Sequence, residues 1–544
     1  MSEKVTRSDE KKSIFGLEVN GPVFFTSAFI IIVSIVLTLL FEKRAQEIFS
    51  SVQETVATNG GWFFILSVNV FLIFMIYLAF SKFGKLRIGG QNAKPEFKTL
   101  SWFAMLFSAG MGIGLLFWSI AEPINHFNSP PMAEGGTTAA AREAMNFTFL
   151  HWGFHAWAIY ALVGLALAYF TYSRGLPLTI RSIFHPFLGD KIHGWIGDII
   201  DIFAVLATLF GLATSLGLGV KQIAAGLNHV FDISGGITTQ VSLIAGITLI
   251  ATISVVAGVD KGVRFLSEWN MRIAVALLVL VVILGPTIFI FQSFVQNTGS
   301  YFYNFLNLST WTESFTGTDW QNSWTVFYWG WWIAWSPFVG TFIARVSKGR
   351  TVSEFILGVL IVPSLVTFFW ISAFGSVSIQ QALLGDNTII DAVDDNVATA
   401  LFVFLEDYPI AIALNVIAVI LIAGFFVTSS DSGSLVVDSL TSGGKIDAPV
   451  GQRIFWAVAE GTVAAVLLIG GGLQALQTAS IVTGLPFAFI LLFMCYSLYK
   501  GLKEDLQKLN EKETQKEMDN YEEIVSEIVQ KRNLKSETGK QENS

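Results

Sequence analysis

The stretch SAGMGIGLLFW, residues 108–118, carries glycines at alternate positions inside an apolar run of membrane-spanning length. A glycine in a helix interior costs about 1 kcal/mol relative to alanine, and lipid offers no partner for a freed backbone group. Two explanations are open. A second helix could pack closely on Gly110 and Gly114, which are four residues apart, or the helix could be unwound around Gly112. The alternation favours unwinding, and unwound helices bind substrates and ions in secondary transporters.

The composition requires a membrane protein. Of 544 residues, 53% are hydrophobic and only 14% are charged, which is more apolar surface than a water-soluble core can bury. A bilayer span needs about 20 apolar residues. We therefore predict an all-α integral membrane protein with twelve spans, at approximately 21–41, 62–81, 101–121, 148–172, 196–225, 236–258, 272–295, 324–345, 354–378, 409–429, 453–473 and 477–499.

Basic residues indicate the orientation of these spans. Lys and Arg cluster in alternate loops, whereas residues 296–323 and 379–408 contain neither. Because cytoplasmic loops carry the excess of Lys and Arg, both termini are expected in the cytoplasm. Residues 1–19 are polar and do not resemble a cleavable signal. The single cysteine, Cys495, excludes an intramolecular disulfide, and the charged stretch 500–544 predicts a soluble, partly helical tail.

Aromatic residues are concentrated in two of the predicted spans. On a continuous helix, Trp152, Trp157 and Tyr160 would share one face. Residues 329–335 hold four tryptophans in seven positions: Trp329, Trp331, Trp332 and Trp335. Scattered tryptophans usually mark the membrane surface. Two inward-facing clusters fit better with a cage for a quaternary ammonium, which aromatic faces attract by about 0.5 to 2 kcal/mol per contact.

Few charges lie deep in the spans. Glu460 is the deepest carboxylate and could be functional or could reach the membrane surface, while His151 and His155 are expected to be buried hydrogen-bonding groups. The segment AGFFVTSSDSGS offers a set of hydroxyls at the end of a predicted span. Thr428, Ser429, Ser430 and Ser432 could either cap that helix or, together with carbonyls of the broken helix, bind sodium.

Three segments carry a resemblance to a known family. MGIGLLFWSIAEP (111–123), HWGFHAWAIYALVGLALAYFTYSRGLPL (151–178) and WGWWIAWSPFVGTFIARVSKGRTVSEFILGVLIVPS (329–364) are similar to the hallmark segments of betaine/carnitine/choline transporters. The similarity extends through most of residues 20–500. Within the family, the chain most closely resembles sodium-coupled glycine betaine symporters of bacteria.

The resemblance implies two leading helices followed by two inverted five-helix repeats, whose first helices are both interrupted. In the second repeat, Ser336 and Pro337 would make the interruption. The implied organisation is a cytoplasmic segment 1–19, leading helices 20–100, a first repeat 101–295, an extracellular loop 296–323, a second repeat 324–499 and a cytoplasmic tail 500–544.

The resemblance also implies the binding residues. Trp332 is the first choice for substrate contact, with Trp152, Trp157, Tyr160, Trp329, Trp331 and Trp335 around it and Gly112 and Gly114 facing a substrate carboxylate. One sodium would be held by backbone oxygens of Ser108, Met111 and Phe425 and by the hydroxyls of Thr428 and Ser429. A second family sodium site falls on Thr208, Leu212 and Phe338, and departs from the pattern because Leu212 has no oxygen.

Choline-transporting relatives tend to carry an acid near Gly114, so glycine there favours a zwitterion. We therefore expect a sodium-coupled importer of glycine betaine for osmoprotection, in a bacterial cytoplasmic membrane and as a homotrimer. The alternatives are a sodium-independent or proton-coupled carrier of choline or carnitine, or a membrane osmolyte sensor. An enzyme is not expected because no nucleophile, metal cluster or phosphate-binding loop is apparent, and no nucleic-acid partner is expected.

Overall fold

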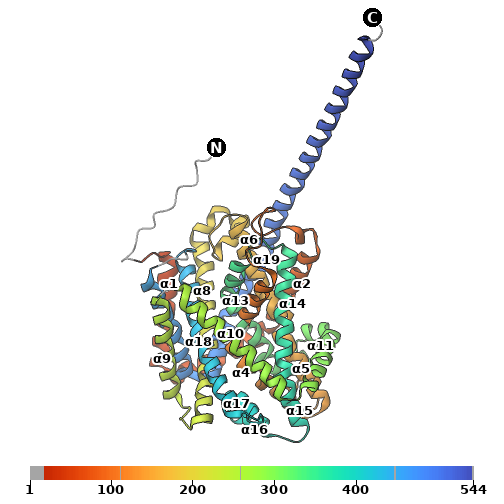
Figure 1. Ribbon diagram of the computed structural model, residues 1–544. Helices are drawn as coiled ribbons and strands as arrows, with labels where there is room; N and C mark the ends of the chain where they lie inside the picture. The colour runs from red at the N-terminus through yellow and green to blue at the C-terminus, as the bar shows by residue number, and fades with distance from the viewer. Residues whose placement is uncertain (1–16, 111, 258, 316, 446–448, 542–544) are drawn as a thin grey trace.

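The computed structural model describes residues 17–541 apart from 111, 258, 316 and 446–448, and it describes no side chains at 109–110, 257–265 and 532–541. It is a bundle of helices (Figure 1). In chain order these are α1 (Gly21–Leu40), α2 (Glu42–Phe80), α3 (Thr99–Gly110), α4 (Ile113–Asn128), α5 (Thr138–Trp152), α6 (Phe154–Tyr172), α7 (His185–Leu188), α8 (Trp195–Phe231), α9 (Ile237–Ala257), α10 (Val259–Leu284), α11 (Thr287–Thr310), α12 (Trp320–Ser323), α13 (Thr325–Val346), α14 (Val352–Ile371), α15 (Val377–Leu383), α16 (Thr388–Asn396), α17 (Ala400–Glu406), α18 (Ala411–Thr441) and α19 (Val450–Gln541).

Many of these helices suit a bilayer. Within the described ranges, nine helices are long and apolar enough to cross it, or ten if the bent pair Thr99–Ser108 and Ile113–Asn128 forms one span. α19 contains both of the last two predicted spans, and its backbone leaves helical geometry at Gly471 and Gly472, near the end of the first of them. The prediction of a multi-pass, all-helical membrane protein is confirmed.

The glycine-rich stretch interrupts a helix. α3 ends at Gly110, α4 begins at Ile113, and the two segments are bent by 66°. Gly112 has an extended backbone, with φ −169° and ψ −171°. Gln222 from α8 donates its side-chain N–H to the carbonyl of Leu116 at 3.0 Å, so part of the first turn of α4 is bonded to another helix. The break therefore lies inside protein, as an interrupted helix in lipid requires.

A second break was not predicted. The span expected at 148–172 is divided at Gly153, with φ −101° and ψ −141°, into α5 and α6. A Cβ at this glycine would lie 2.5 Å from the carbonyl oxygen of Phe149 and 2.8 Å from the ring of Phe368. The expectation that Trp152, Trp157 and Tyr160 share one face of a continuous helix is therefore wrong, because Trp152 ends one helix and the other two belong to the next.

The expected interruption at Ser336 and Pro337 is also wrong. α13 continues through both residues, although Pro337 cannot donate a backbone hydrogen bond to the carbonyl of Ile333. The hydroxyl of Ser336 donates to that carbonyl instead, at 2.7 Å. A neighbouring side chain thus replaces the lost bond, which lets a membrane helix tolerate proline.

Three other boundaries differ from the prediction. The span expected at 272–295 stops at Leu284, because Gly285 and Pro286 follow, and α11 then begins. Residues 296–323, expected as a loop, are largely helical, since they contain most of α11 and all of α12. α18 runs on to Thr441, so the hydroxyls at 428–432 lie in mid-helix and do not cap its end.

The predicted tail is helical and continuous with the bundle. In Figure 1, the last part of α19 leaves the bundle as one long helix. Its base is attached by Arg174, which lies 3.1 Å from Glu504 and 3.0 Å from Asp505. The hydroxyl of Tyr169 also donates to the carbonyl of Gly501 at 2.7 Å. The base of the tail is therefore attached to the end of α6 and to Arg174 just after it.

Candidate functional site

Five of the predicted aromatic residues form one connected group, which we call the cage: Trp152, Trp157, Tyr160, Trp331 and Trp332. The ring of Trp332 stacks on Trp331 with centroids 4.6 Å apart and meets Trp152 edge-on at 4.9 Å. Tyr160 lies 6.2 Å from Trp332 and 5.5 Å from Trp157. α13 and α6 pack directly against each other, which brings these rings together from distant parts of the chain.

The other two predicted tryptophans lie elsewhere. Trp329 stacks on His155 at 5.7 Å and meets His151 at 5.9 Å, so it faces a different side of α13. Trp335 contacts Phe338 at 5.3 Å and lines a separate cavity. A residue that the sequence analysis did not consider, Tyr328, lies 5.7 Å from both Trp152 and Trp332.

Buried polar atoms of the cage and its neighbour are available to a ligand. Within the described part of the chain, the Tyr160 hydroxyl and the indole nitrogens of Trp331 and Trp335 are buried and have no hydrogen-bond partner. Because buried polar groups are nearly always paired, unpaired donors next to aromatic faces suit a small ligand that has both a cationic and an acceptor end.

The glycines of the break make room for the cage. A Cβ on Gly114 would lie 2.5 Å from Trp331 and 3.3 Å from Trp152, and one on Gly112 would lie 4.0 Å from Trp335. Gly114 therefore adjoins the cage, while Gly112 lies toward the neighbouring cavity. A side chain at Gly114 would compete with Trp331 for space, so this glycine has a second function besides unwinding.

Gly114→Ala should displace the Trp331 ring, because the added methyl group would lie only 2.5 Å from that ring. Overpacking of this kind costs about 1 to 3 kcal/mol, so we expect roughly tenfold weaker substrate binding. Gly246→Ala in α9 is the control, since a Cβ there meets nothing within 4 Å. Equilibrium binding to both purified variants tests this. Equal affinities would contradict a close fit between Gly114 and the cage.

The predicted sodium ligands meet in a cavity of about 100 Å³ beside the break. Ser108 of α3 and Phe425, Thr428 and Ser429 of α18 all line it, together with Trp335. Met111 lies outside the described residues. The polar atoms here are hydroxyls and amides, which are neutral oxygen ligands of the type that hard cations prefer. The cavity walls are completed by Ser267, Asn270, Phe338, Val339, Phe342 and Ser432.

Asn270 is a wall residue that the sequence analysis missed. It is 4% exposed, and its amide donates to the Thr428 hydroxyl at 3.3 Å. Thr428 itself donates to carbonyls of its own helix, at 3.1 Å to Gly424 and 3.2 Å to Phe425. Ser430, by contrast, faces away from the cavity and donates to Glu460 at 3.4 Å. The hydroxyl run is thus divided between two faces of α18.

The residues of the predicted second sodium site have different surroundings. Thr208 is buried and donates to the carbonyl of Ala204 on its own helix at 2.7 Å. Leu212 packs on Gly433, where a Cβ would meet it at 2.4 Å. Phe338 instead lines the cavity near Thr428. The described contacts of Thr208 and Phe338 supply no shared oxygen set, and this site stays a prediction.

A buried carboxylate next to the cage was also missed. Glu122 of α4 is inaccessible to solvent, and its two oxygens are close to four side chains. Oε1 lies 2.6 Å from Nδ1 of His151 and 3.2 Å from Nε2 of His126. Oε2 accepts the indole N–H of Trp152 at 2.7 Å and the hydroxyl of Tyr328 at 2.5 Å.

Glu122 was overlooked because it falls just beyond the predicted span 101–121, where an acid usually faces the membrane surface. The one available signal was its place in the hallmark segment MGIGLLFWSIAEP. The ligating atoms of Glu122, His126 and His151 lie within 4.8 Å of one another, but their spacings are hydrogen-bond lengths. Glu122, His126 and His151 therefore form a hydrogen-bond network.

The ionisable side chains singled out in the sequence, His151, His155 and Glu460, are all buried. The ring of His155 lies 3.3 Å from the side-chain oxygen of Asn69, and His151 belongs to the Glu122 network, which confirms both as hydrogen-bonding histidines. Glu460 is fully buried. It therefore does not reach the membrane surface, which was one of the two explanations for it.

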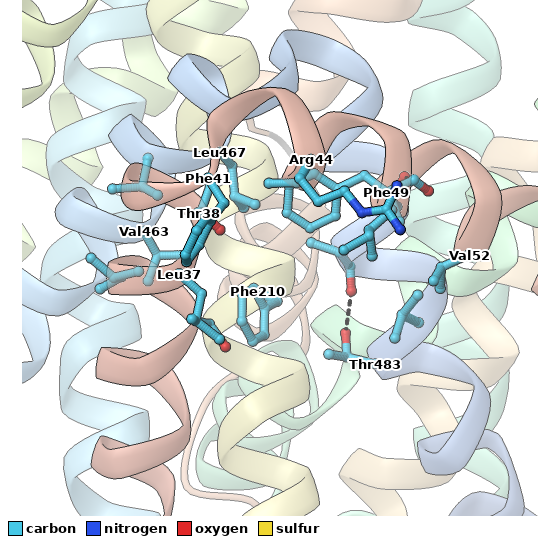
Figure 2. Close-up of a pocket in the computed structure, with 18 residues that line it drawn as sticks. Leu37, Thr38, Phe41, Arg44, Phe49, Val52, Phe210, Val463, Leu467 and Thr483 are labelled. Atoms are coloured by element: carbon cyan, nitrogen blue, oxygen red, sulfur yellow. Dashed lines mark hydrogen bonds between the residues drawn. The ribbon is translucent and has the colours of Figure 1, made fainter.

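An apolar cavity of about 520 Å³ shares no described lining residue with the cage or with the hydroxyl cavity. It is an apolar groove between α1, α2, α8 and α19, and Figure 2 shows Leu37, Phe41, Val463 and Leu467 around it. Arg44 lines it but is paired with Glu47 at 2.7 Å, and both side chains are exposed. Its aromatic lining consists of Phe41, Phe49 and Phe210, and among the described residues it has no tryptophan or tyrosine of the kind that forms the cage.

Comparison with known proteins gives extensive matches. A glycine betaine transporter of Vibrio parahaemolyticus is 49% identical over 508 residues, covering 91% of this chain and 95% of its own. A glycine betaine/proline/choline/ectoine transporter of the same species is 48% identical over 509 residues, covering 90% and 89%. A glycine betaine transporter of Acinetobacter baylyi is 44% identical over 492 residues, covering 90% and 74%.

A family model described as "BCCT, betaine/carnitine/choline family transporter" matches residues 22–507. This range includes the broken helix, the cage and the hydroxyl cavity. The family resemblance seen in the three hallmark segments is thereby confirmed, and the protein is a transporter and not an enzyme. The chain belongs to the betaine/carnitine/choline family of transporters.

Proposed function

We propose that this transporter imports glycine betaine together with sodium, as an osmoprotectant. The observation that carries the proposal is the cage of Trp152, Trp331 and Trp332, buried beside the glycine break. Aromatic faces attract the diffuse charge of a quaternary ammonium without a buried anion in direct contact. The names of the relatives support the same class of substrate, since the three described above are all called glycine betaine transporters.

The carboxylate end of the substrate has its own partners in this proposal. Gly112 precedes α4 with an extended backbone, and although its carbonyl accepts the Leu116 N–H at 3.4 Å, the N–H groups at the start of α4 have no carbonyl of a preceding turn to bond. Helix α4 also begins here, and a helix N-terminus favours a negative group. A zwitterion fits such a site because its ammonium meets the cage and its carboxylate meets the start of α4. Choline has no carboxylate and would leave the second half of the site unused.

Sodium is the coupling ion in this proposal, held in the cavity beside the break. Ser108 belongs to α3, whereas Thr428 and Ser429 belong to α18, so a cation between them would join two helices that are remote in sequence. Such a cation would order the end of α3 next to the cage and thereby favour substrate binding. Thr208 and Phe338 would contribute to a second sodium site.

Alternating access follows from this arrangement. Counting α13 and the two halves of α19 as spans, we propose twelve spans in two inverted five-helix repeats after two leading helices, with both termini in the cytoplasm. α5 and α6 contribute to the cage from the first repeat and α13 from the second. Rocking of one repeat against the other would expose the cage first to one side and then to the other. We further propose a homotrimer in the bacterial cytoplasmic membrane.

Uptake into proteoliposomes tests the function. We expect labelled glycine betaine to accumulate under an inward sodium gradient, and not under an equal proton gradient, because the hydroxyls and the amide that line the ion cavity do not titrate. An equal potassium gradient tests whether the site distinguishes the two metal ions. Unlabelled choline, carnitine, proline and ectoine serve as competitors. Uptake driven by protons alone would contradict sodium coupling, and exchange without a gradient would indicate an antiporter. Binding without transport would indicate an osmolyte sensor.

A further inference from the structure

The carboxylate of Glu122 lies at the meeting point of α4, α5 and α13. His126 belongs to its own helix, His151 and Trp152 come from α5, and Tyr328 comes from α13. Tyr328 and Glu122 are 206 residues apart in sequence. One buried side chain therefore connects the two halves of the chain immediately beside the cage.

The geometry is that of an ionised carboxylate. An indole nitrogen can only donate, so Oε2 accepts from Trp152, and the Tyr328 hydroxyl donates to the same oxygen. Oε1 faces ring nitrogens of two histidines. A buried negative charge is tolerated only when it is hydrogen-bonded on all sides, and four partners supply that condition. Hydrogen bonds to such a charge are shorter and stronger than neutral ones.

This charge acts on the cage through one of its rings, Trp152, and through the adjacent ring of Tyr328. Trp152 forms one wall, 4.9 Å from Trp332 and 6.4 Å from Trp331, and its N–H points to Glu122. Groups linked by hydrogen bonds polarise one another, so an indole that donates to a carboxylate has a more electron-rich face. Tyr328 is held by the same oxygen and lies 5.7 Å from Trp332.

We propose that Glu122 is a positioning residue for the cationic end of the substrate. It holds Trp152 and Tyr328 in place, and its negative charge strengthens the attraction of Trp152 for a quaternary ammonium. It also disfavours the reversed orientation, in which the substrate carboxylate would face Trp152. This inference rests on the proposed function, and it adds a residue that acts through the cage without touching the substrate.

The test compares two ligands of the same shape. Glycine betaine and its carbon isostere, tert-butylacetate, share a carboxylate and a trimethyl head, but only betaine carries the positive charge. Calorimetric binding to the purified protein and to Glu122→Gln gives the ratio of their affinities. We expect Glu122→Gln to weaken betaine binding about tenfold and the binding of the isostere less than about threefold. Damage to the shape of the cage alone would weaken both ligands equally.

Trp152→Phe is the matched variant, because it keeps an aromatic wall and removes the N–H that Glu122 accepts. Its betaine preference should fall as in Glu122→Gln, and the double variant should show no further loss, since Glu122→Gln removes the charge and Trp152→Phe removes the hydrogen bond through which that charge acts on the cage. If Glu122→Gln does not fold, Trp152→Phe alone gives the ratio.

An unchanged ratio in the variants, with betaine bound by the unmodified protein, would overturn the role of Glu122. Failure of the unmodified protein to bind betaine would instead overturn the proposed function. The two failures are therefore distinguished by one measurement on the protein without substitutions.

Discussion

Trp332→Ala should reduce kcat/KM for glycine betaine uptake by roughly 100-fold. The ring is 5% exposed and stacks on Trp331 at 4.6 Å, so it forms the centre of the cage. A desolvated cation–π contact is worth about 2 kcal/mol. The ring pairing that holds Trp331 in place adds about 1 kcal/mol. Together these losses, about 3 kcal/mol, correspond to that factor. Sodium-driven uptake in proteoliposomes is the measurement.

Two further variants separate substrate contact from general damage. Trp62→Ala removes a ring that is 58% exposed on α2, outside the cage, and should leave uptake unchanged. Trp332→Phe keeps a ring but loses the N–H that donates to the carbonyl of His151 at 2.8 Å, and should give an intermediate loss. Full activity of Trp332→Ala, in protein whose thermal unfolding is normal, would exclude the cage as the substrate site.

Thr428→Val combined with Ser429→Ala should raise the sodium concentration for half-maximal uptake about 100-fold. Loss of a group that merely supports a metal ligand weakens metal affinity 10- to 100-fold, so loss of two direct ligands should reach at least the upper value. Both residues line the cavity that Ser108 also lines. Helix α18 should tolerate the change, because the hydroxyl of Thr428 otherwise bonds only to Asn270 and to carbonyls of its own helix.

Thr483→Val provides the matched control for this experiment. Thr483 also donates to a carbonyl of its own helix, that of Ala479 at 2.7 Å, but it lines the apolar groove (Figure 2) and not the hydroxyl cavity. Its sodium dependence should equal that of the unmodified protein. Betaine uptake measured over a range of external sodium gives the answer. An unchanged sodium requirement in the double variant would show that the ion binds elsewhere.

Much of the candidate site was predictable from residue type. Gly112 and Gly114 in an apolar run predicted the break, and the density of tryptophans in 329–335 predicted a cage helix. The hydroxyls of Thr428 and Ser429 were correctly placed near Ser108, although this rested on the family resemblance. These features are local or are recorded in short motifs, and they do not depend on the exact rotation of a helix.

Side-chain direction could not be predicted in the same way. Trp329 faces His155 and not the cage, because the neighbours of α13 decide which of its faces meets α6. The break at Gly153 likewise depends on the ring of Phe368, which is distant in sequence. Helical periodicity assumes a continuous helix, whereas the break at Gly153 places Trp152 on a different helix from Trp157 and Tyr160.

By itself, the sequence determined the membrane class, the positions of most spans, the broken helix and the chemistry of the ligand. The hydrophobic requirement of the bilayer and the cost of glycine in a helix act locally, so their effects can be predicted from composition and spacing. Only the tertiary structure showed that Glu122 accepts hydrogen bonds from Trp152 and Tyr328. From sequence, an acid at the end of a span is expected to be a surface residue. In the structure, helices from both halves of the chain pack around Glu122 and exclude water.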